Sequence, residues 1–259
     1  MSTPQILVTN DDGITSKGIR LLTEVACQFG EVTIVAPDKP QSGMGHAITV
    51  ADPLKLKCST TLFTDLPVKA YTCSGTPADC VKMANDIIYK TNSPDLVLSG
   101  INHGSNSSIS VLYSGTMSAA IEAAIENIPA IGFSLCEYGD DTEMSHCKEW
   151  MEKIIVQILE NGTSAHTALN VNIPAFSKEP IKGIKIARQS TARWYEKYEK
   201  RTDPFGNDYY WIAGDFIKPN EGTDTDEWAL DNNYVSVVPC QFDMTAHKKL
   251  AFFKEKWSI

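Results

Sequence analysis

The sequence lacks a basic tract and a long apolar run, and each absence excludes a class of protein. With 23 Lys and Arg against 32 Asp and Glu, the formal charge is -9 at pH 7. Nucleic-acid polymers and anionic membranes attract clustered Lys and Arg, so we expect neither as a partner. No run approaches the ~20 apolar residues of a membrane-spanning helix, and the start of the chain does not resemble a secretory signal.

Closely spaced cysteine pairs are also missing. The seven cysteines are odd in number and scattered, and no C-x-x-C motif occurs. This pattern is typical of reduced thiols in a cytosolic protein and argues against a disulfide framework or a zinc site. The expected compartment is therefore the cytoplasm.

Several catalytic motifs are absent as well. The chain has no G-x-x-x-x-G-K-[ST], no G-x-G-x-x-G and no G-x-S-x-G motif, so an ATP-driven enzyme, a dinucleotide-binding enzyme and an esterase lack support. The adjacent acids of the motif N-D-D-G do not match the D-x-D spacing of haloacid-dehalogenase-like phosphatases. The five histidines lack metal-ligand spacing.

What the sequence does contain is an alternation of short β-branched runs and helical patterns. The run 5–9 precedes a helical pattern at 16–29, whose apolar residues recur at three- and four-residue spacing. Further runs and helical patterns follow at 31–37, 54–58, 68–73, from 76 onward, and at 95–100, 117–127, 128–135, 146–160 and 168–174. Such alternation is typical of a mostly parallel sheet covered on both faces by helices. The predicted fold is α/β, with three α/β/α layers and a Rossmann-like sheet.

The composition changes after residue 188. The stretch 189–233 is rich in aromatic and charged residues and has a turn signal at 203–206, which predicts a protruding C-terminal β-hairpin arm. So many Tyr and Trp side chains on a thin extension need a surface to cover them, either a partner subunit or the protein's own core. We predict a core at 1–188, an oligomerisation arm at 189–233, and a strand and C-terminal segment at 234–259 that return to the core or to a partner subunit.

Polar loops follow three of the predicted strands. Ligands of an open α/β sheet bind outside the carboxyl ends of the strands, and the loops there carry Asp11, Asp12, Ser42, Asn102 and Asn106. All of these side chains offer oxygen, which suits a hard divalent cation such as Mg²⁺ or Mn²⁺. Without a cation, two carboxylates roughly 4 Å apart repel by about 4 kcal/mol at an effective dielectric of about 20. The alternative is that one aspartate caps the following helix and the other is a solvated loop charge.

The segment Ser114-Gly115-Thr116 lies where another helix is expected to begin. Free N–H groups and the positive end of the helix dipole bind anions at such a position. The alternative is ordinary capping of the helix by Ser or Thr. Beside a divalent cation, this segment predicts a phosphate site.

Six motifs occur in order between residues 6 and 174: TNDDG, QSGMG, SGTPADCV, SGINHGSN, YSGTMSAA and NVNIP. Together they resemble the SurE survival-protein family of nucleotidases, and the stretch 236–246 resembles that family's return to the core. The resemblance implies a divalent-metal-dependent phosphomonoesterase that acts on nucleoside 5′- and 3′-monophosphates, with polyphosphate hydrolysis in some members. It also implies a homodimer or homotetramer formed through the arm.

The resemblance further implies roles for individual residues. The family's ligands for one divalent metal ion per subunit, with Mg²⁺ or Mn²⁺ expected, correspond to Asp11, Asp12, Ser42 and Asn102. Its phosphate contacts correspond to Asn106, Ser114, Gly115 and Thr116. One departure is Gln41, which stands where Arg commonly precedes Ser-Gly in the family and bears on substrate preference.

For the reaction itself, we expect Asp11 to orient or deprotonate the attacking water, although the sequence does not separate it from Asp12. The alternative function is a non-catalytic, oligomeric regulatory module that binds metal and nucleotide without hydrolysis. The acidic pair favours catalysis, because a pure binding site gains little from carboxylates that face a phosphate.

Overall fold

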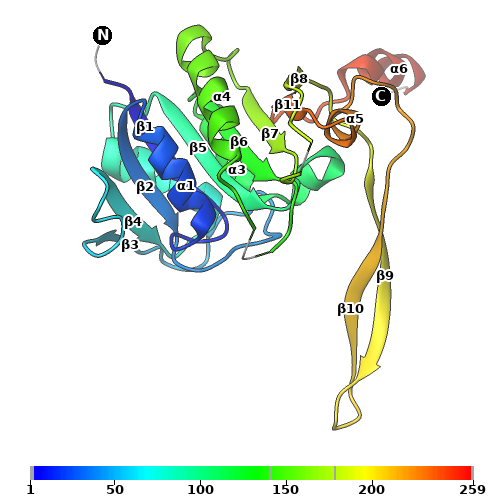
Figure 1. Ribbon diagram of the computed structural model, residues 1–259. Helices are drawn as coiled ribbons and strands as arrows, with labels where there is room; N and C mark the ends of the chain where they lie inside the picture. The colour runs from blue at the N-terminus through cyan, green and yellow to red at the C-terminus, as the bar shows by residue number, and fades with distance from the viewer. Residues whose placement is uncertain (1–2, 140–141, 178, 258–259) are drawn as a thin grey trace.

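A mostly parallel sheet forms the centre of the computed structural model, which describes residues 3–139, 142–177 and 179–257 (Figure 1). The strand order is β3-β4-β2-β1-β5-β6-β7-β11-β8. These strands span Gln5–Thr9 (β1), Glu31–Pro37 (β2), Leu56–Ser59 (β3), Lys69–Cys73 (β4), Leu96–His103 (β5), Ala130–Leu135 (β6), Ala168–Ile173 (β7), Ile184–Ile186 (β8) and Val235–Cys240 (β11). β3 runs antiparallel to β4 and β11 antiparallel to β7, whereas the other neighbours are parallel.

Helices cover both faces of this sheet. The helices on one face are α1 (Lys17–Ala26) and α4 (Cys147–Asn161), and those on the other are α2 (Pro77–Met83) and α3 (Gly115–Ile125). β1 illustrates why both faces need cover, since Ile6 and Val8 lie in the core beneath α1 and α4, and Leu7 lies beneath α2 and α3. The three-layer α/β prediction is confirmed.

Local capping chemistry decides where the first helices begin. Ser16 caps α1, and Thr76 and Asp79 form a capping box at the start of α2, where Pro77 stands in the first turn. The prediction of a helix over 16–29 was too long, because α1 ends at Ala26 and turns carry the chain to Gly30. A Cβ at Gly30 would lie 2.3 Å from the carbonyl oxygen of Pro4, so the chain passes close to the start of β1 there.

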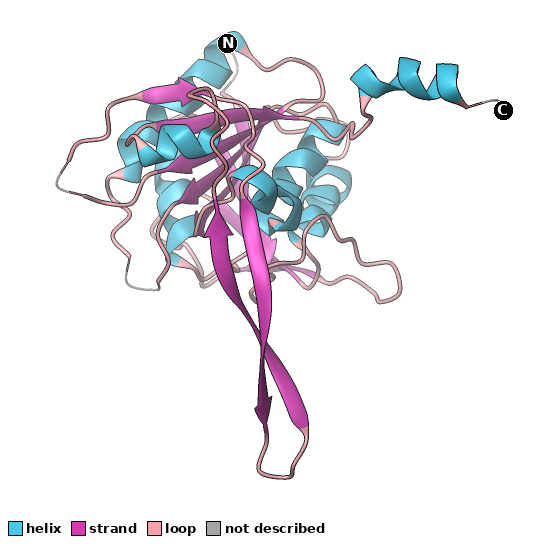
Figure 2. Cartoon of the chain, turned by 90° about the vertical axis from the view of Figure 1, so that its right-hand side faces the viewer, coloured by secondary structure: helices cyan, strands magenta, loops and turns pink. Residues whose placement is uncertain are grey.

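The remaining helical segments are short. They span Ala84–Tyr89 (η1, a π-helix), Ser108–Tyr113 (η2), Asp226–Asp231 (α5), His247–Lys249 (η3) and Leu250–Lys256 (α6). α5 lies within the range predicted for the arm, yet it packs beside β11 of the core. α6 lies away from the sheet (Figure 2). Across the described ranges, no helix is long and apolar enough to cross a membrane.

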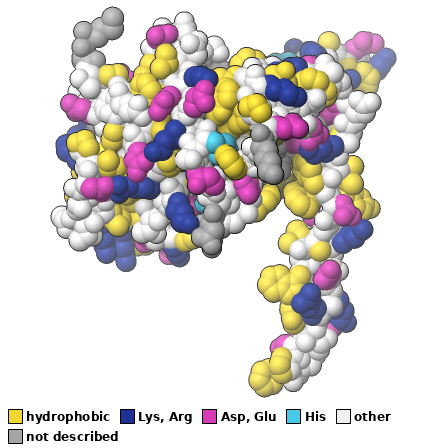
Figure 3. Space-filling view, in the orientation of Figure 1, with side chains coloured by type: hydrophobic (Ala, Val, Ile, Leu, Met, Phe, Trp, Pro, Cys, Tyr) yellow, Lys and Arg dark blue, Asp and Glu magenta, His cyan; other side chains and the backbone are white. Residues whose placement is uncertain are grey.

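The predicted hairpin is confirmed. β9 (Arg193–Thr202) pairs antiparallel with β10 (Asp208–Ile217), and the pair projects well beyond the core (Figures 1 and 2). Apolar side chains alternate with charged ones along its visible face (Figure 3). The paired strands occupy 193–217 of the predicted range 189–233.

Candidate active site

The turn after β1 brings Asp11 and Asp12 to the carboxyl end of the sheet, as the sequence predicts. The buried side chain of Asn10 holds this turn, because its Nδ2 donates to the carbonyl of Gly13 at 3.0 Å and to Oγ of Ser16 at 2.9 Å. Gly13 has φ +91°, a conformation that favours glycine. The sequence prediction gave Asn10 no role, although it stands in the motif N-D-D-G.

Asp11 lies directly against the start of α3. Thr116 donates its hydroxyl to Oδ1 of Asp11 at 2.6 Å, across 105 positions of sequence. A Cβ at Gly115 would lie 2.6 Å from the Cβ of Asp11, so only glycine permits this approach. The predicted cation loop and the predicted phosphate site are therefore in direct contact.

Burial dominates the electrostatics of Asp11, whose exposed fraction is 4%. Burial raises the pKa of Asp11 to about 6, and the neighbouring charge of Asp12 adds to the rise, while the hydrogen bond from Thr116 opposes it. A positively charged partner would stabilise the ionised form of this buried carboxylate. A hard divalent cation suits that role, because the predicted ligands all offer oxygen.

The loop that carries Ser42 contacts both the turn after β1 and the segment that precedes α3. Gln41 donates its backbone N–H to the carbonyl of Asp11 at 2.8 Å, and Gly45 donates to the carbonyl of Tyr113 at 3.1 Å. Ser42 itself is exposed to solvent. The structure therefore places the Ser42 loop beside Asp11 through its backbone.

Asn102 lies at the end of β5, next to β1 in the sheet, where Thr9 pairs with Ser99. The register of β5 against β6 shifts between Ser99 and Asn102, an irregularity that redirects a side chain. Nδ2 of Asn102 donates to the carbonyl of Gly104 at 2.8 Å. Because the amide nitrogen is engaged in this way, the amide oxygen is the group with which Asn102 would bind a cation.

Asn106 lies over the ends of β6 and β7. Its backbone N–H donates to Oδ1 of Asn172 at 2.8 Å, its Nδ2 donates to Oγ of Ser134 at 2.8 Å, and its carbonyl accepts from Nδ2 of Asn170 at 2.8 Å. Asn170 and Asn172 are buried on one face of β7. Sequence reasoning gave them no role, although two polar residues at i and i+2 of a buried strand were the available signal.

Ser114 caps α3, because its Oγ accepts from the backbone N–H of Met117 at 3.0 Å. The hydroxyls of Ser114 and Thr116 thus both have structural partners. An anion at this position would meet the first backbone N–H groups of α3.

Comparison with known proteins gives a consistent result. The model of the family described as "Survival protein SurE" matches residues 6–196. The 5′-nucleotidase SurE of Cytophaga hutchinsonii is 59% identical over 259 residues, covering 100% of this chain and 99% of that protein. The 5′-nucleotidase SurE of Christiangramia forsetii is 54% identical, covering 99% of this chain and 97% of that protein.

A solved structure agrees with these matches. The crystal structure of the SurE protein from Aquifex aeolicus is similar with a TM-score of 0.82 and 40% identity, covering 97% of this chain and 99% of that one. The resemblance noted in the sequence is therefore confirmed. This chain belongs to the SurE family.

Proposed function

We propose that this protein is a divalent-metal-dependent 5′-nucleotidase, which hydrolyses nucleoside 5′-monophosphates to nucleoside and phosphate. The observation that carries the proposal is the contact between Asp11 and the start of α3, which sets an acidic group beside an anion-binding helix end. The relatives in Cytophaga hutchinsonii and Christiangramia forsetii are named 5′-nucleotidases, which supports the same activity here.

The residues fit one divalent ion, Mg²⁺ or Mn²⁺, by the chemistry of their donors. Asp11, Asp12, Ser42 and Asn102 would hold it, all through oxygen. Within the described ranges, no three His, Cys, Asp or Glu side chains gather to hold a metal ion, so such a site needs Ser42 and Asn102 as well. When bound, a divalent ion polarises phosphoryl oxygens and lowers the pKa of a coordinated water.

The chain's own residues bind the phosphate and direct the water. The backbone N–H groups at the start of α3 and the loop of Asn106 would bind the phosphoryl oxygens. Asp11 would orient or deprotonate the water, and the hydrogen bond from Thr116 holds its carboxylate in one orientation.

Three finer statements belong to the same proposal. Nucleoside 3′-monophosphates and short polyphosphates are further substrates, since the proposed groups recognise phosphate rather than a base. The protein is a homodimer or homotetramer through the arm, where Tyr195, Tyr198 and Trp211 are more than half exposed. The seven cysteines are free thiols, which supports a cytoplasmic location.

A substrate panel tests the proposal. Phosphate release is measured from 5′-AMP, 3′-AMP and tripolyphosphate with Mg²⁺, with Mn²⁺ and with EDTA. We expect release from 5′-AMP that EDTA abolishes and either metal restores. Binding of 5′-AMP without release would favour the non-catalytic module, and full activity in EDTA would exclude the metal.

The variant Asp11→Asn tests whether this carboxylate takes part in the reaction. It removes the carboxylate proposed to act on the water, and loss of a general base lowers kcat by at least about two orders of magnitude. A near-wild-type kcat, measured at saturating 5′-AMP, would remove Asp11 from the mechanism.

A further inference from the structure

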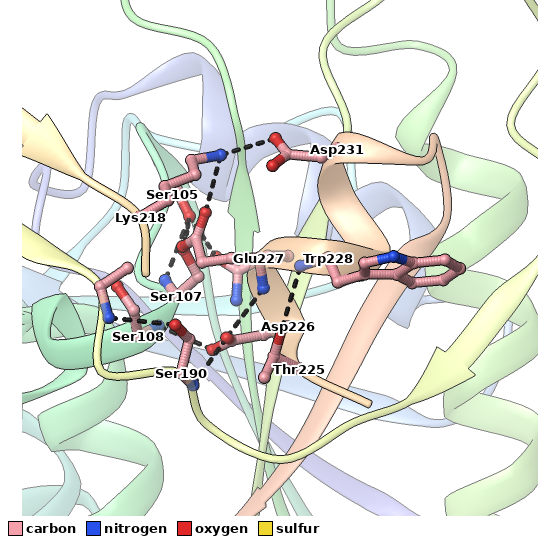
Figure 4. Close-up of polar contacts among 12 residues, drawn as sticks. Ser105, Ser107, Ser108, Ser190, Lys218, Thr225, Asp226, Glu227, Trp228 and Asp231 are labelled. Atoms are coloured by element: carbon pink, nitrogen blue, oxygen red, sulfur yellow. Dashed lines mark hydrogen bonds and ion pairs between the residues drawn. The ribbon is translucent and has the colours of Figure 1, made fainter. Parts of the chain in front are cut away.

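The short helix α5 contacts the segment that carries Asn106 and leads to α3, and no motif predicted this contact. Its first two residues, Asp226 and Glu227, are acidic and buried. They bind Ser108 and Ser107, which precede them by 118 and 120 positions in the sequence. Figure 4 shows the two acids between this segment and the residues at the base of the arm.

Asp226 joins two backbone segments. Its Oδ2 accepts the backbone N–H of Ser108 at 2.7 Å, and its Oδ1 accepts the backbone N–H of Ser190 at 2.9 Å. Ser108 has φ +54°, a conformation that residues other than glycine rarely adopt. Ser190 lies just before β9. Asp226 therefore connects the segment 105–108, which includes Asn106, to the residues that lead into the hairpin of β9 and β10.

Glu227 makes a similar connection through side chains. One carboxylate oxygen accepts the hydroxyl of Ser107, and the other lies 2.9 Å from Nζ of Lys218, next to the end of β10. A carboxylate only accepts, so the single hydroxyl proton of Ser107 is committed to Glu227. In the 2.6 Å contact between the hydroxyls of Ser105 and Ser107, Ser105 is then the donor, and Oδ1 of Asn172, at 3.2 Å, competes for the same proton. Glu227 thus orders the hydroxyls on both sides of Asn106.

We infer that Glu227 is a positioning residue of the active site, which holds Asn106 for the substrate phosphate through Ser107. Lys218 is its counter-ion and connects this contact to the arm. The inference rests on the proposed function, because it assigns Asn106 to the phosphate.

Glu227→Ala tests the inference. The change leaves the hydroxyl of Ser107 without its charged acceptor and frees Ser105 to turn. Because Asn106 would contact the phosphate in both the substrate and the transition state, the loss appears in KM and not in kcat. We expect KM for 5′-AMP and the inhibition constant of inorganic phosphate to rise about tenfold, equal to about 1.4 kcal/mol.

Matched variants separate this role from a general effect on folding. Glu227→Gln keeps a carbonyl acceptor for Ser107, so KM returns to within about twofold of the wild type. Ser107→Ala removes the same hydrogen bond from the other side and reproduces the rise in KM. Asp231→Asn removes the other carboxylate on Lys218, at 2.6 Å, without touching Ser107, and leaves KM unchanged.

A second measurement does not depend on activity. Amide hydrogen exchange over residues 104–114 becomes faster in Glu227→Ala and stays at the wild-type rate in Asp231→Asn. Equal exchange in both variants, or an unchanged KM in Glu227→Ala and Ser107→Ala, overturns the inference. So does an equal loss of kcat in Glu227→Ala and Glu227→Gln. A wild-type protein that releases no phosphate would instead refute the proposed function.

Discussion

Thr116 and Asp11 form a hydrogen bond through which a single hydroxyl can affect the proposed reaction. Asp11 is surrounded by α3, the turn after β1 and the loop of Gln41, and Thr116 at the start of α3 donates to its carboxylate. The hydroxyl of Thr116 donates to Oδ1 of Asp11 and so can hold the carboxylate in one orientation.

Thr116→Val removes this hydroxyl while keeping the shape of the side chain. We expect kcat for 5′-AMP to fall about tenfold, because a misoriented carboxylate loses part of its effect on the water. Thr116→Ser restores the hydroxyl and should restore most of the rate. Equal rates in the two variants would show that the hydrogen bond does not matter.

Glu122 is a second buried acid, and it predicts how stability depends on pH. It is 3% exposed, and its carboxylate lies 2.6 Å from Nζ of Lys82 and 2.8 Å from Nε2 of His46. Burial acts to raise the pKa of Glu122, but the hydrogen bonds from His46 and Lys82 outweigh it and hold the pKa below its ordinary value of 4.5. The resulting stabilisation is present above pH 4.5 and is lost as the pH falls through the lowered value.

We therefore expect Glu122→Gln to lower the free energy of unfolding by about 1–2 kcal/mol at pH 7, since Lys82 is partly exposed. Below pH 4.5 the difference from the wild type should shrink. Urea unfolding at a series of pH values measures it. The control is Glu149→Gln, which breaks an exposed pair with Lys153 and should change stability little. A difference that is constant with pH would contradict the assignment.

At the scale of elements, the first turn of α3 begins a helix and also packs against Asp11 of the proposed site. Gly115→Ala improves the helix propensity by up to about 1 kcal/mol, but its Cβ would collide with Asp11. We expect kcat to fall by about tenfold or more with only a small change in the unfolding temperature. Kinetics at saturating 5′-AMP and thermal unfolding of the same preparation give both numbers. A fully active Gly115→Ala would mean that Asp11 can move away without consequence.

The same elements show what the sequence could predict. Helix starts follow local chemistry, so the helix predicted from residue 76 onward is confirmed by α2, which Thr76 caps. Asp11 and the segment 114–116 also carry local signals. By contrast, the hydrogen bonds between Asn106 and Asn172, and between Ser107 and Glu227, join residues 66 and 120 positions apart. No periodicity or capping motif encodes such a pairing, because only the finished sheet brings these residues together.

At the scale of the whole molecule, the core and the arm differ in what stabilises them. The core buries its strands between two layers of helices, whereas among the described residues the ten-residue strands of the arm pair only with each other. An isolated two-stranded hairpin is marginally stable in water. An arm this long and this aromatic is therefore expected to be completed by a second copy of the chain.

Deletion of the arm tests that expectation. Arg193 and Ile217 pair across the hairpin, so an Asn-Gly turn can join them in place of residues 194–216. Light scattering should give a multiple of 28.5 kDa for the full chain and a single chain for the shortened one. Trp211→Lys, which places a charge on the exposed surface of the arm, should weaken the oligomer without removing the hairpin. Retention of the oligomer in both variants, or a monomeric full chain, would show that the arm does not join subunits.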